Sequence, residues 1–308
     1  MPCYEPLQGF LIEGPEGRRI SFKYSERGRG ISLPCGRCVG CRLERARQWS
    51  VRIMHEAELH ENSCFVTLTY RDVPADGSLS KKHCQDFMKR LRERIAPVKV
   101  RYFLCGEYGE KFARPHYHMI LFGYDFPDKV KLKNDGEHAL FRSDELDSCW
   151  QHGFCSIGKV TFDSACYCAN YAQKKVVGKK AAEHYGKRLP EFLLMSRRPG
   201  IGRGWIEMFQ SDVYPSDEVI VRGRKARPPR YYDQVVKENS PELMDGIKAK
   251  RDEAQSVMED FVYRSPVTGE RITMRFEKDK HPLRLKVLKR VAEAKLRLKT
   301  RKLENDNA

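Results

Sequence analysis

The amino-acid sequence predicts an α+β fold, in which a central antiparallel sheet of about five strands is flanked by helices, with extra helices at both ends. Runs of β-branched and aromatic residues with alternating character predict strands at 65–70, 98–104 and 116–122. The short connection between the last two favours neighbouring antiparallel strands. Apolar residues at helical spacing between the first two strands complete a pattern that is typical of an α+β sandwich.

The N-terminal part is predicted to be irregular at first and then helical. Residues 1–41 are rich in Gly, Pro and Arg with little periodicity, so we expect an irregular leader. From Leu43 to Ala57, apolar side chains recur at the spacing of a helix. A second helix is expected after Ser80, a good N-cap residue, and Pro97 ends it. Its apolar stripe consists of Cys84, Phe87, Met88, Leu91 and Ile95.

The middle of the chain continues the mixed pattern. An insertion at 125–149 separates the third strand from a fourth, near 154–160. A helix is then expected from Asp163 through Lys175. The order strand, helix, strand, strand, strand, helix again indicates the α+β class.

The composition changes after Pro215. Residues 222–230 form a basic, turn-rich run that we expect to be a linker without a packed core. Residues 283–303 predict a basic amphipathic helix with few acidic residues, which favours contact with phosphate groups. The chain is therefore expected to have three parts, which are a Cys-rich N-terminal segment with its helix (1–60), a central α+β domain (61–215) and a basic linker with a helical region (216–308).

Charge and cysteine usage narrow the class of partner and the cellular compartment. The 308-residue chain carries a formal net charge of +16, which implies a polyanionic partner, and nucleic acid fits best. No apolar run approaches the length of a membrane span and the start of the chain lacks a signal-peptide pattern, so we expect no membrane association and a cytoplasmic protein. The odd count of 11 cysteines argues for free thiols or metal ligands over a disulfide framework.

The third predicted strand begins with two histidines, His116 and His118, whose i, i+2 spacing places both side chains on one face. Two neighbouring imidazoles on a rigid sheet suit a divalent metal ion that takes one or two further ligands. Glu107 ends the preceding strand and is the expected third ligand. Glu110 in the following loop is the alternative, which a register error of one residue would select.

The one dense cysteine cluster has the spacing Cys35-x-x-Cys38-x-x-Cys41. Three thiolates at this spacing can bind one ion, and Cys3 is a candidate fourth ligand that would complete a tetrahedral zinc site. Structural Zn²⁺ and reduced thiols without a ligand stay open as alternatives, since a second Cys-x-x-Cys pair is absent from the sequence. The other cysteines are predicted to be small, mostly buried residues.

The helix expected at 163–175 carries Tyr167 and Tyr171, which are i, i+4 neighbours and must share a face. Lys175 continues that face and Lys174 lies close to it. Two tyrosines at this spacing are most often core residues, but beside a metal site in a basic protein they become candidate nucleophiles.

Two weaker signals are also present. The glycine pattern Gly200-x-Gly202-x-Gly204 would let backbone amides approach a phosphate, although a tight loop is the commoner role. Trp150 and Trp205 could stack on single-stranded bases, although core packing is the commoner fate of tryptophan.

These motifs together resemble a known family. The strand at 65–69, the His116-Tyr117-His118 strand and the helix that contains Tyr167 and Tyr171 occur in the order of the three motifs of the HUH endonucleases, which initiate rolling-circle replication. The run Arg114-Pro115 before the histidines, the cysteine cluster and the segment 199–205 look like the replication-initiation proteins of the Microviridae, of the gokushovirus type. The resemblance covers residues 30–210. The middle residue of the triplet, Tyr117, departs from the aliphatic residue usual in the family, but it points away from the metal face.

The resemblance implies a ferredoxin-like or RRM-like fold and a nickase that acts on single-stranded DNA at an origin. His116, His118 and a carboxylate would hold Mg²⁺ or Mn²⁺. A tyrosine would attack the phosphodiester, giving a 5′-phosphotyrosine enzyme and a 3′-hydroxyl that primes a polymerase, and reversal would rejoin ends. Lys174 or Lys175 would stabilise the phenolate or the phosphate. The partners implied are single-stranded and origin DNA, a host helicase and a host DNA polymerase, in the host bacterial cytoplasm.

Two alternatives remain at this stage. A relaxase or transposase of the same fold would use the same residues on another DNA substrate. A non-enzymatic nucleic-acid-binding protein would carry the histidines and tyrosines as structural residues.

Overall fold

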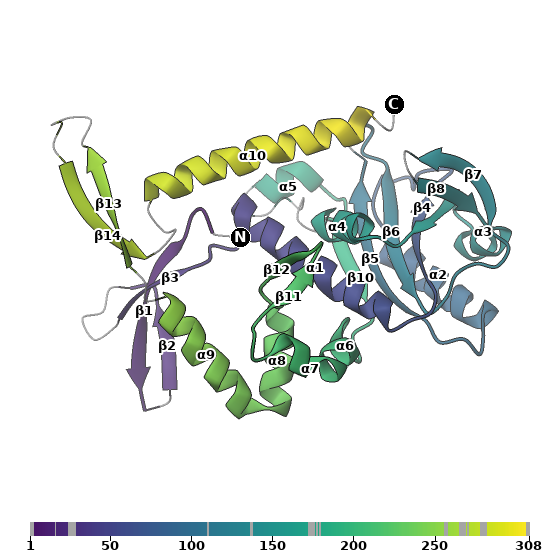
Figure 1. The fold of residues 1–308 in the computed structure, drawn as a ribbon. Helices are drawn as coiled ribbons and strands as arrows, with labels where there is room; N and C mark the ends of the chain where they lie inside the picture. Colours follow the sequence, from purple (N-terminus) through teal and green to yellow (C-terminus); the bar gives the residue numbers. More distant parts are fainter. Residues whose placement is uncertain are drawn as a thin grey trace. The chain divides into compact units, whose positions relative to one another are not determined.

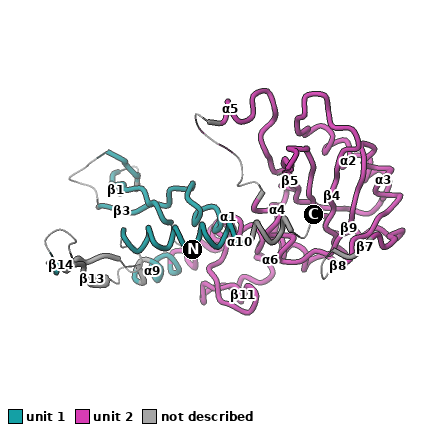
Figure 2. Tube along the Cα trace, turned by 90° about the horizontal axis from the view of Figure 1, so that it is seen from above, with its two compact units in different colours: residues 1–45, 246–308 teal, residues 46–245 magenta. Residues whose placement is uncertain are grey.

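The computed structural model (Figure 1) describes residues 3–15, 17–23, 29–109, 111–135, 138–171, 176, 178, 180–255, 258–264, 269, 271–277 and 282–305. The chain divides into two compact units (Figure 2), of which the first comprises residues 1–45 and 246–308 and the second residues 46–245. The three-part division expected from the sequence stays a prediction.

The second unit is built on a seven-stranded antiparallel sheet with the order β10-β5-β6-β4-β9-β8-β7. This confirms the predicted α+β class, while the sheet has more strands than the five or so expected. Its strands are β4 Ser63–Thr69, β5 Arg101–Tyr108, β6 Pro115–Phe122, β7 Val130–Asp135, β8 His138–Arg142, β9 Cys155–Lys159 and β10 Phe192–Met195. The hairpin of β7 and β8 lies in the predicted insertion, and β10 lies outside the predicted strands.

Helices cover both faces of this sheet (Figure 1). On one face, side chains of α2 (Lys81–Arg94) and α3 (Asp144–Trp150) pack with Leu68, Leu104 and Tyr117 of the central strands. On the other, α1 (Val39–Glu58) and α4 (Phe162–Tyr171) pack with Phe103 and Ile120. Alternation along each strand thus divides the core into two layers.

The middle strand β6 shows this alternation most clearly. Tyr117, Met119 and Leu121 belong to the layer beneath α2, whereas Ile120 and Phe122 belong to the layer beneath α1 and α4. The fully buried Tyr117 hydroxyl accepts a hydrogen bond from the Ser80 amide at 2.8 Å. Ser80 is itself the N-cap of α2, as predicted, so a side chain of the central strand holds the start of this helix.

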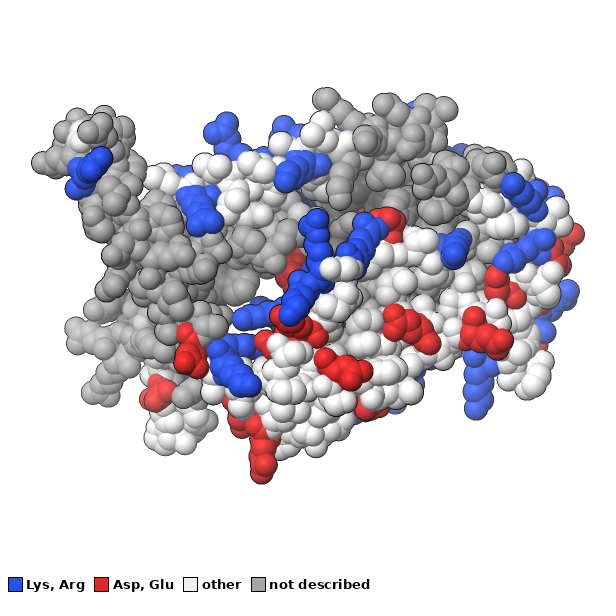
Figure 3. Space-filling view, viewed as in Figure 1, with Lys and Arg blue, Asp and Glu red and all other residues white. Residues whose placement is uncertain are grey.

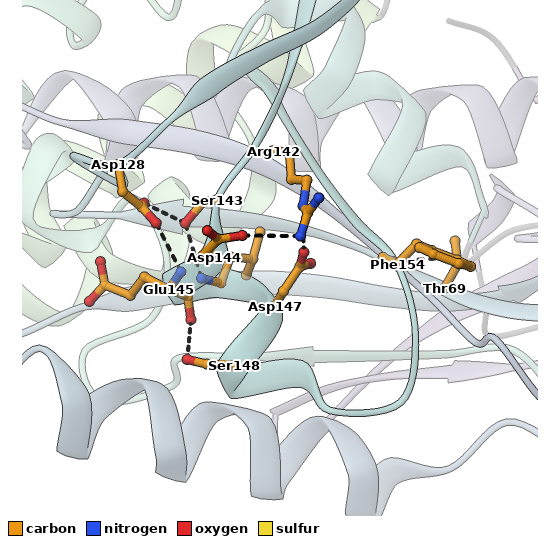
Figure 4. A network of polar contacts seen from close by, with 10 residues as sticks. Thr69, Asp128, Arg142, Ser143, Asp144, Glu145, Asp147, Ser148 and Phe154 are labelled. Atoms are coloured by element: carbon orange, nitrogen blue, oxygen red, sulfur yellow. Dashed lines mark hydrogen bonds and ion pairs between the residues drawn. The ribbon is translucent and has the colours of Figure 1, made fainter.

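The segment before β7 is joined to the start of α3 (Figure 4). Ser143, its N-cap residue, donates to Asp128 Oδ1 at 2.5 Å, and the Glu145 amide donates to Asp128 Oδ2 at 2.9 Å. A carboxylate at this position accepts from amides that the helix itself leaves without partners. Arg142 pairs with two further acidic side chains of the helix.

The rest of the second unit consists of short elements and one longer helix. They are α5 Lys180–Tyr185, α6 Arg203–Met208, α7 Gln210–Val213, β11 Val219–Val221, β12 Arg224–Ala226 and α8 Arg230–Asn239. The prediction of a linker at 222–230 was wrong, because this run forms a hairpin and the start of α8. Arg222 and Gly223, with φ values of 52° and 70°, form the turn, and Pro228 and Pro229 are buried.

The glycine-rich segment before α6 serves close packing. A Cβ at Gly200 would lie 2.3 Å from the Tyr231 hydroxyl, and one at Gly202 would lie 2.8 Å from the Tyr232 hydroxyl. The Gly202 amide donates to the buried carboxylate of Glu56 at 2.6 Å. We therefore assign these glycines to contacts between α6, α8 and α1, and the tight-loop alternative explains them without a phosphate.

The first unit contains two small sheets and long helices. Its elements are β1 Leu7–Gly14, β2 Gly17–Ser21, β3 Arg29–Leu33, α9 Pro241–Gln255, which begins in the second unit, β13 Met258–Arg264, β14 Arg271–Glu277 and α10 Pro282–Asn305. Strands β1 to β3 form an antiparallel sheet, so the expectation of an irregular leader at 1–41 was wrong. The predicted C-terminal helix is confirmed as α10.

We predict that Gly202→Ala destabilises the second unit more than Gly77→Ala does. Both glycines have positive φ values, 77° and 60°, where an alanine costs about 1–2 kcal/mol. Only at Gly202 does the added Cβ also meet buried atoms, whereas nothing lies within 4 Å at Gly77. Urea unfolding followed by tryptophan fluorescence measures both, and equal losses of stability would contradict this packing role.

Candidate metal and tyrosine site

Three side chains converge at one end of the paired strands β5 and β6. The Nε2 atoms of His116 and His118 lie 2.6 Å and 3.0 Å from Glu107 Oε1. The register places Glu107 directly opposite His116, and period two places His118 on the same face. The three ligand atoms lie within 4.8 Å of one another, so the structure brings together the three residues that the sequence predicted as metal ligands.

Hydrogen bonds on the far side of each ring fix how the imidazoles point. Nδ1 of His116 lies 3.1 Å from the carbonyl oxygen of Arg114, which can only accept, so this nitrogen carries the proton. In the neutral ring, Nε2 is then the nitrogen that can ligate a metal ion. Nδ1 of His118 lies 3.1 Å from the hydroxyl of Thr67 on β4. Metal-binding histidines are commonly oriented in this way, by a partner on the second ring nitrogen.

The carboxylate of Glu107 fits a bound cation. The residue is only 3% exposed, and its Oε2 has no hydrogen-bond partner among the described residues. An ionised carboxylate is costly to bury unless a positive charge compensates it. Burial also lowers the pKa of His118, which favours the neutral form that ligates metals. Two imidazoles and one carboxylate are together a donor set that can hold a divalent metal ion.

The alternative ligand Glu110 lies outside the described residues. Glu107 and His116 are direct partners in the sheet, and the choice between the two carboxylates stays a prediction.

Helix α4 places Tyr167 against the histidine pair. The rings of Tyr167 and His118 meet edge to face with their centroids 4.8 Å apart. The Phe65 ring lies parallel to His118 at 5.6 Å and meets Tyr167 edge to face at 6.3 Å. The helix is held by Ala165 and Cys168, both fully buried beneath the sheet. Tyr167 therefore lies in the same layer as the candidate metal ligands.

The remaining predicted residues are only partly described. Tyr171 is the last residue of α4, one helical turn after Tyr167, and its side chain lies outside the described part of the structure. Lys174 and Lys175 also lie outside it. Their roles stay predictions.

The structure adds residues around the site that the sequence reasoning missed. Arg114 donates from its guanidinium to the carbonyl of Tyr70 at 2.9 Å, which fastens the β5–β6 connection to the end of β4. Phe112, in that connection, is 82% exposed. Phe154, between α3 and β9, is 62% exposed, and the Arg71 guanidinium lies 5.4 Å from its ring. The sequence alone does not reveal that these two aromatic rings are exposed, because exposure depends on the three-dimensional fold.

The two tryptophans lie in different surroundings. Trp150 is fully buried and donates to the carbonyl of Thr69 at 2.7 Å. Trp205 stacks on His55 with ring centroids 3.5 Å apart and donates to Glu58. Core packing, the alternative considered, describes Trp150.

The four cysteines Cys3, Cys35, Cys38 and Cys41 also come together, in the first unit, with their sulfurs within 4.8 Å of one another. The other cysteines are buried, as predicted, apart from the half-buried Cys166.

Positive charge is widely spread over the surface. On the face in Figure 3, the Lys and Arg side chains among the described residues are interspersed with Asp and Glu and do not form one continuous patch. None of the described helices combines the length and apolar character that crossing a membrane requires.

Comparison with known proteins identifies the family of the chain. The family model described as "Replication-associated protein ORF2/G2P" matches residues 63–176, a span that runs from β4 past the end of α4. Replication-associated protein VP4 of Bdellovibrio phage phiMH2K is 32% identical over 264 residues, which cover 81% of this chain and 82% of that protein.

Two further phage proteins are similar. Replication-associated protein ORF2 of Spiroplasma virus 4 is 31% identical over 283 residues, covering 82% of this chain and 86% of that protein. Replication-associated protein ORF4 of Chlamydia phage 1 is 28% identical over 220 residues, covering 67% and 53%. No solved structure matches the chain. The matches confirm the resemblance to the replication-initiation proteins of the Microviridae, and the chain belongs to this family of phage replication-associated proteins.

Proposed function

We propose that the protein is a metal-dependent HUH nickase and strand transferase that initiates rolling-circle replication by cutting single-stranded DNA at an origin. The observation that carries the proposal is the convergence of Glu107, His116 and His118 on one point, with the Tyr167 ring against His118. Family membership supports the replication role, and the site supports the chemistry.

The Glu107, His116 and His118 side chains are the proposed ligands of Mg²⁺ or Mn²⁺. When bound, the ion would neutralise the non-bridging oxygens of the scissile phosphate, which otherwise repel a nucleophile. Thr67 and the Arg114 carbonyl hold the two imidazoles in the orientation that this requires. The buried carboxylate supplies the negative charge that makes the site selective for a cation.

A tyrosine of α4 is the proposed nucleophile. Its phenolic oxygen bonds to phosphorus as the bond from phosphorus to the 3′ oxygen breaks, giving a 5′-phosphotyrosine and a free 3′-hydroxyl. The phenol, with an ordinary pKa of about 10, gives up its proton in this step, and the leaving oxygen gains one. Lys174 or Lys175 is proposed to stabilise the phenolate or the phosphate.

Two tyrosines explain how one protein could both cut and rejoin. Tyr167 and Tyr171 are one helical turn apart, so one can hold the first 5′ end while the other cuts the regenerated origin. Because the phosphotyrosine keeps the energy of the original ester, attack by a 3′-hydroxyl reseals the strand without ATP.

The proposed protein partners are host enzymes that unwind and copy the DNA. The sequence contains no G-x-x-x-x-G-K-[ST] motif, so unwinding is assigned to a host helicase and extension of the 3′-hydroxyl to a host DNA polymerase, in the host bacterial cytoplasm. A relaxase or transposase of this fold and a DNA-binding protein without enzymatic activity are the competing functions.

We predict that Tyr167→Phe and Tyr171→Phe each leave some cleavage, while the double variant forms no covalent product and still binds DNA. Removing one hydroxyl leaves the second nucleophile. Labelled single-stranded origin DNA with Mn²⁺ measures the product as an adduct that survives denaturant. Tyr102→Phe, a tyrosine packed against the α2 layer, is the matched control and should behave as wild type.

The outcome separates the competing functions. A DNA-binding protein shifts the DNA and leaves no adduct with wild type. An adduct that persists in the double variant would show that another residue is the nucleophile. A relaxase or transposase would form the adduct on its own DNA substrate and not on the viral origin strand.

We also predict that removing the metal with a chelator, or changing His118→Ala or Glu107→Gln, lowers the rate of adduct formation on the order of 100-fold or more. Losing several kcal/mol of charge stabilisation at the phosphate has this effect. Single-turnover rates with Mn²⁺ provide the measurement, and the exposed His184→Ala is the control. Unchanged rates after chelation would rule out the metal role.

A further inference from the structure

Four thiols from two distant stretches of the first unit meet at the start of α1. Cys3 comes from the segment before β1, while Cys35, Cys38 and Cys41 lie between β3 and the first turn of the helix. All four sulfurs lie within 4.8 Å of one another, and none forms a disulfide. Chain positions separated by 32 residues and more are therefore held together by something other than a covalent link between sulfurs.

The spacing of the sulfurs fits a shared ion. The Sγ atoms of Cys3 and Cys38 are 3.8 Å apart, far beyond the ~2.05 Å of a disulfide. Four sulfurs placed at about 2.3 Å from a central zinc in a tetrahedron lie about 3.8 Å from one another. The observed separation is the one that a tetrathiolate zinc site would have.

Backbone amides are directed at the sulfurs. The amides of Arg37 and Cys38 donate to Cys35 Sγ at 3.4 Å and 3.3 Å. Gly36, which follows Cys35, adopts a φ of 72° and turns the chain around this sulfur. The Cys35 amide donates to Cys3 Sγ at 3.2 Å, and the Tyr4 amide to Cys38 Sγ at 3.3 Å. Such hydrogen bonds favour thiolates, the form that binds metals.

The sheet beside this cluster has little core of its own. In β1 only Gly9 is buried, and the large apolar side chains Leu7, Ile20 and Phe22 are 39%, 50% and 65% exposed. A small sheet that buries so little apolar surface needs another source of stability, and a structural metal is a common one.

We propose that Cys3, Cys35, Cys38 and Cys41 bind one structural Zn²⁺ in a closed tetrahedral site that fastens the N-terminal segment to the start of α1. Four thiolates are soft ligands that favour zinc. Glu107, His116 and His118 offer nitrogen and oxygen ligands and form a separate candidate site. The site leaves no open coordination position, so its role is stability. It is independent of the proposed nicking chemistry.

Metal analysis of the purified full-length protein tests the proposal. We expect about one zinc per chain in wild type and a fall of about tenfold in Cys3→Ser and in Cys38→Ser. Two controls should keep the zinc. Cys166→Ser removes the half-buried thiol outside the cluster, and His118→Ala removes a ligand of the other site, so failure of one proposal is distinguishable from failure of the other.

A second measurement uses wild type alone, in case a variant does not fold. After removal of zinc under reducing conditions, Co²⁺ should bind and give the visible absorption of tetrahedral thiolate coordination. Hydrogen exchange of β1, β2 and β3 should slow when metal is restored, while exchange of β4 and β6 stays unchanged. Absence of zinc and of cobalt uptake, iron in place of zinc, or disulfides in the freshly purified protein would each overturn the proposal.

Discussion

The antiparallel pairing of β5 with β6 is the interaction on which the rest of the site depends. Its register sets Glu107 opposite His116, and because side chains alternate, a slip of one residue would move the carboxylate to the opposite layer. There it would lie among Leu104 and Tyr117, without the imidazoles. Phe103 and Ile120, facing each other in the layer beneath α1 and α4, make the correct register the one that also buries the apolar side chains.

The site places a polar cluster inside an apolar layer. Glu107 and His118 are almost fully buried, and they lie on the same face as Cys105 and Ile120. Burying an ionised carboxylate without a counter-charge costs several kcal/mol, so a sequence selected for stability alone would replace it. Retaining it makes sense where a cation and a phosphate are to be handled, which agrees with the replication role of the family.

Much of this site was predictable from sequence, because side chains along a strand alternate between the two faces of the sheet. The same alternation that marked the strand at 116–122 also put both histidines on one face, and the capped, striped helix after Ser80 needed only local signals. The strands β1 to β3 were missed because Gly9 interrupts β1 and few of its residues are buried. The basic composition of residues 222–230 led to the wrong prediction of a linker. Arg222 and Gly223 form the turn of a hairpin there.

Other features depend on contacts between residues far apart in the chain, which local patterns do not carry. Trp150 is buried against the end of β4, and Gly202 packs on Tyr232 of α8. The exposure of Phe112 follows from the path of the β5–β6 connection, which Arg114 holds in place. Cys3 could be named as a candidate partner of the cluster from chemistry alone, but its position beside Cys38 came from the fold.

The buried hydroxyl of Tyr117 bears on how the two candidate metal sites would bind an ion. By bonding to the backbone of Ser80 behind the sheet, it anchors the middle of the His-Tyr-His strand from the face opposite the imidazoles. The ligands on β6 are thus pre-organised, and an incoming ion has little conformational entropy to remove. The cysteine cluster lies beside a sheet that buries little apolar surface, so binding of the proposed zinc ion there would be coupled to folding. An ion at the candidate site on β6 would meet ligands that are already in place, whereas an ion at the proposed zinc site would order the chain around it.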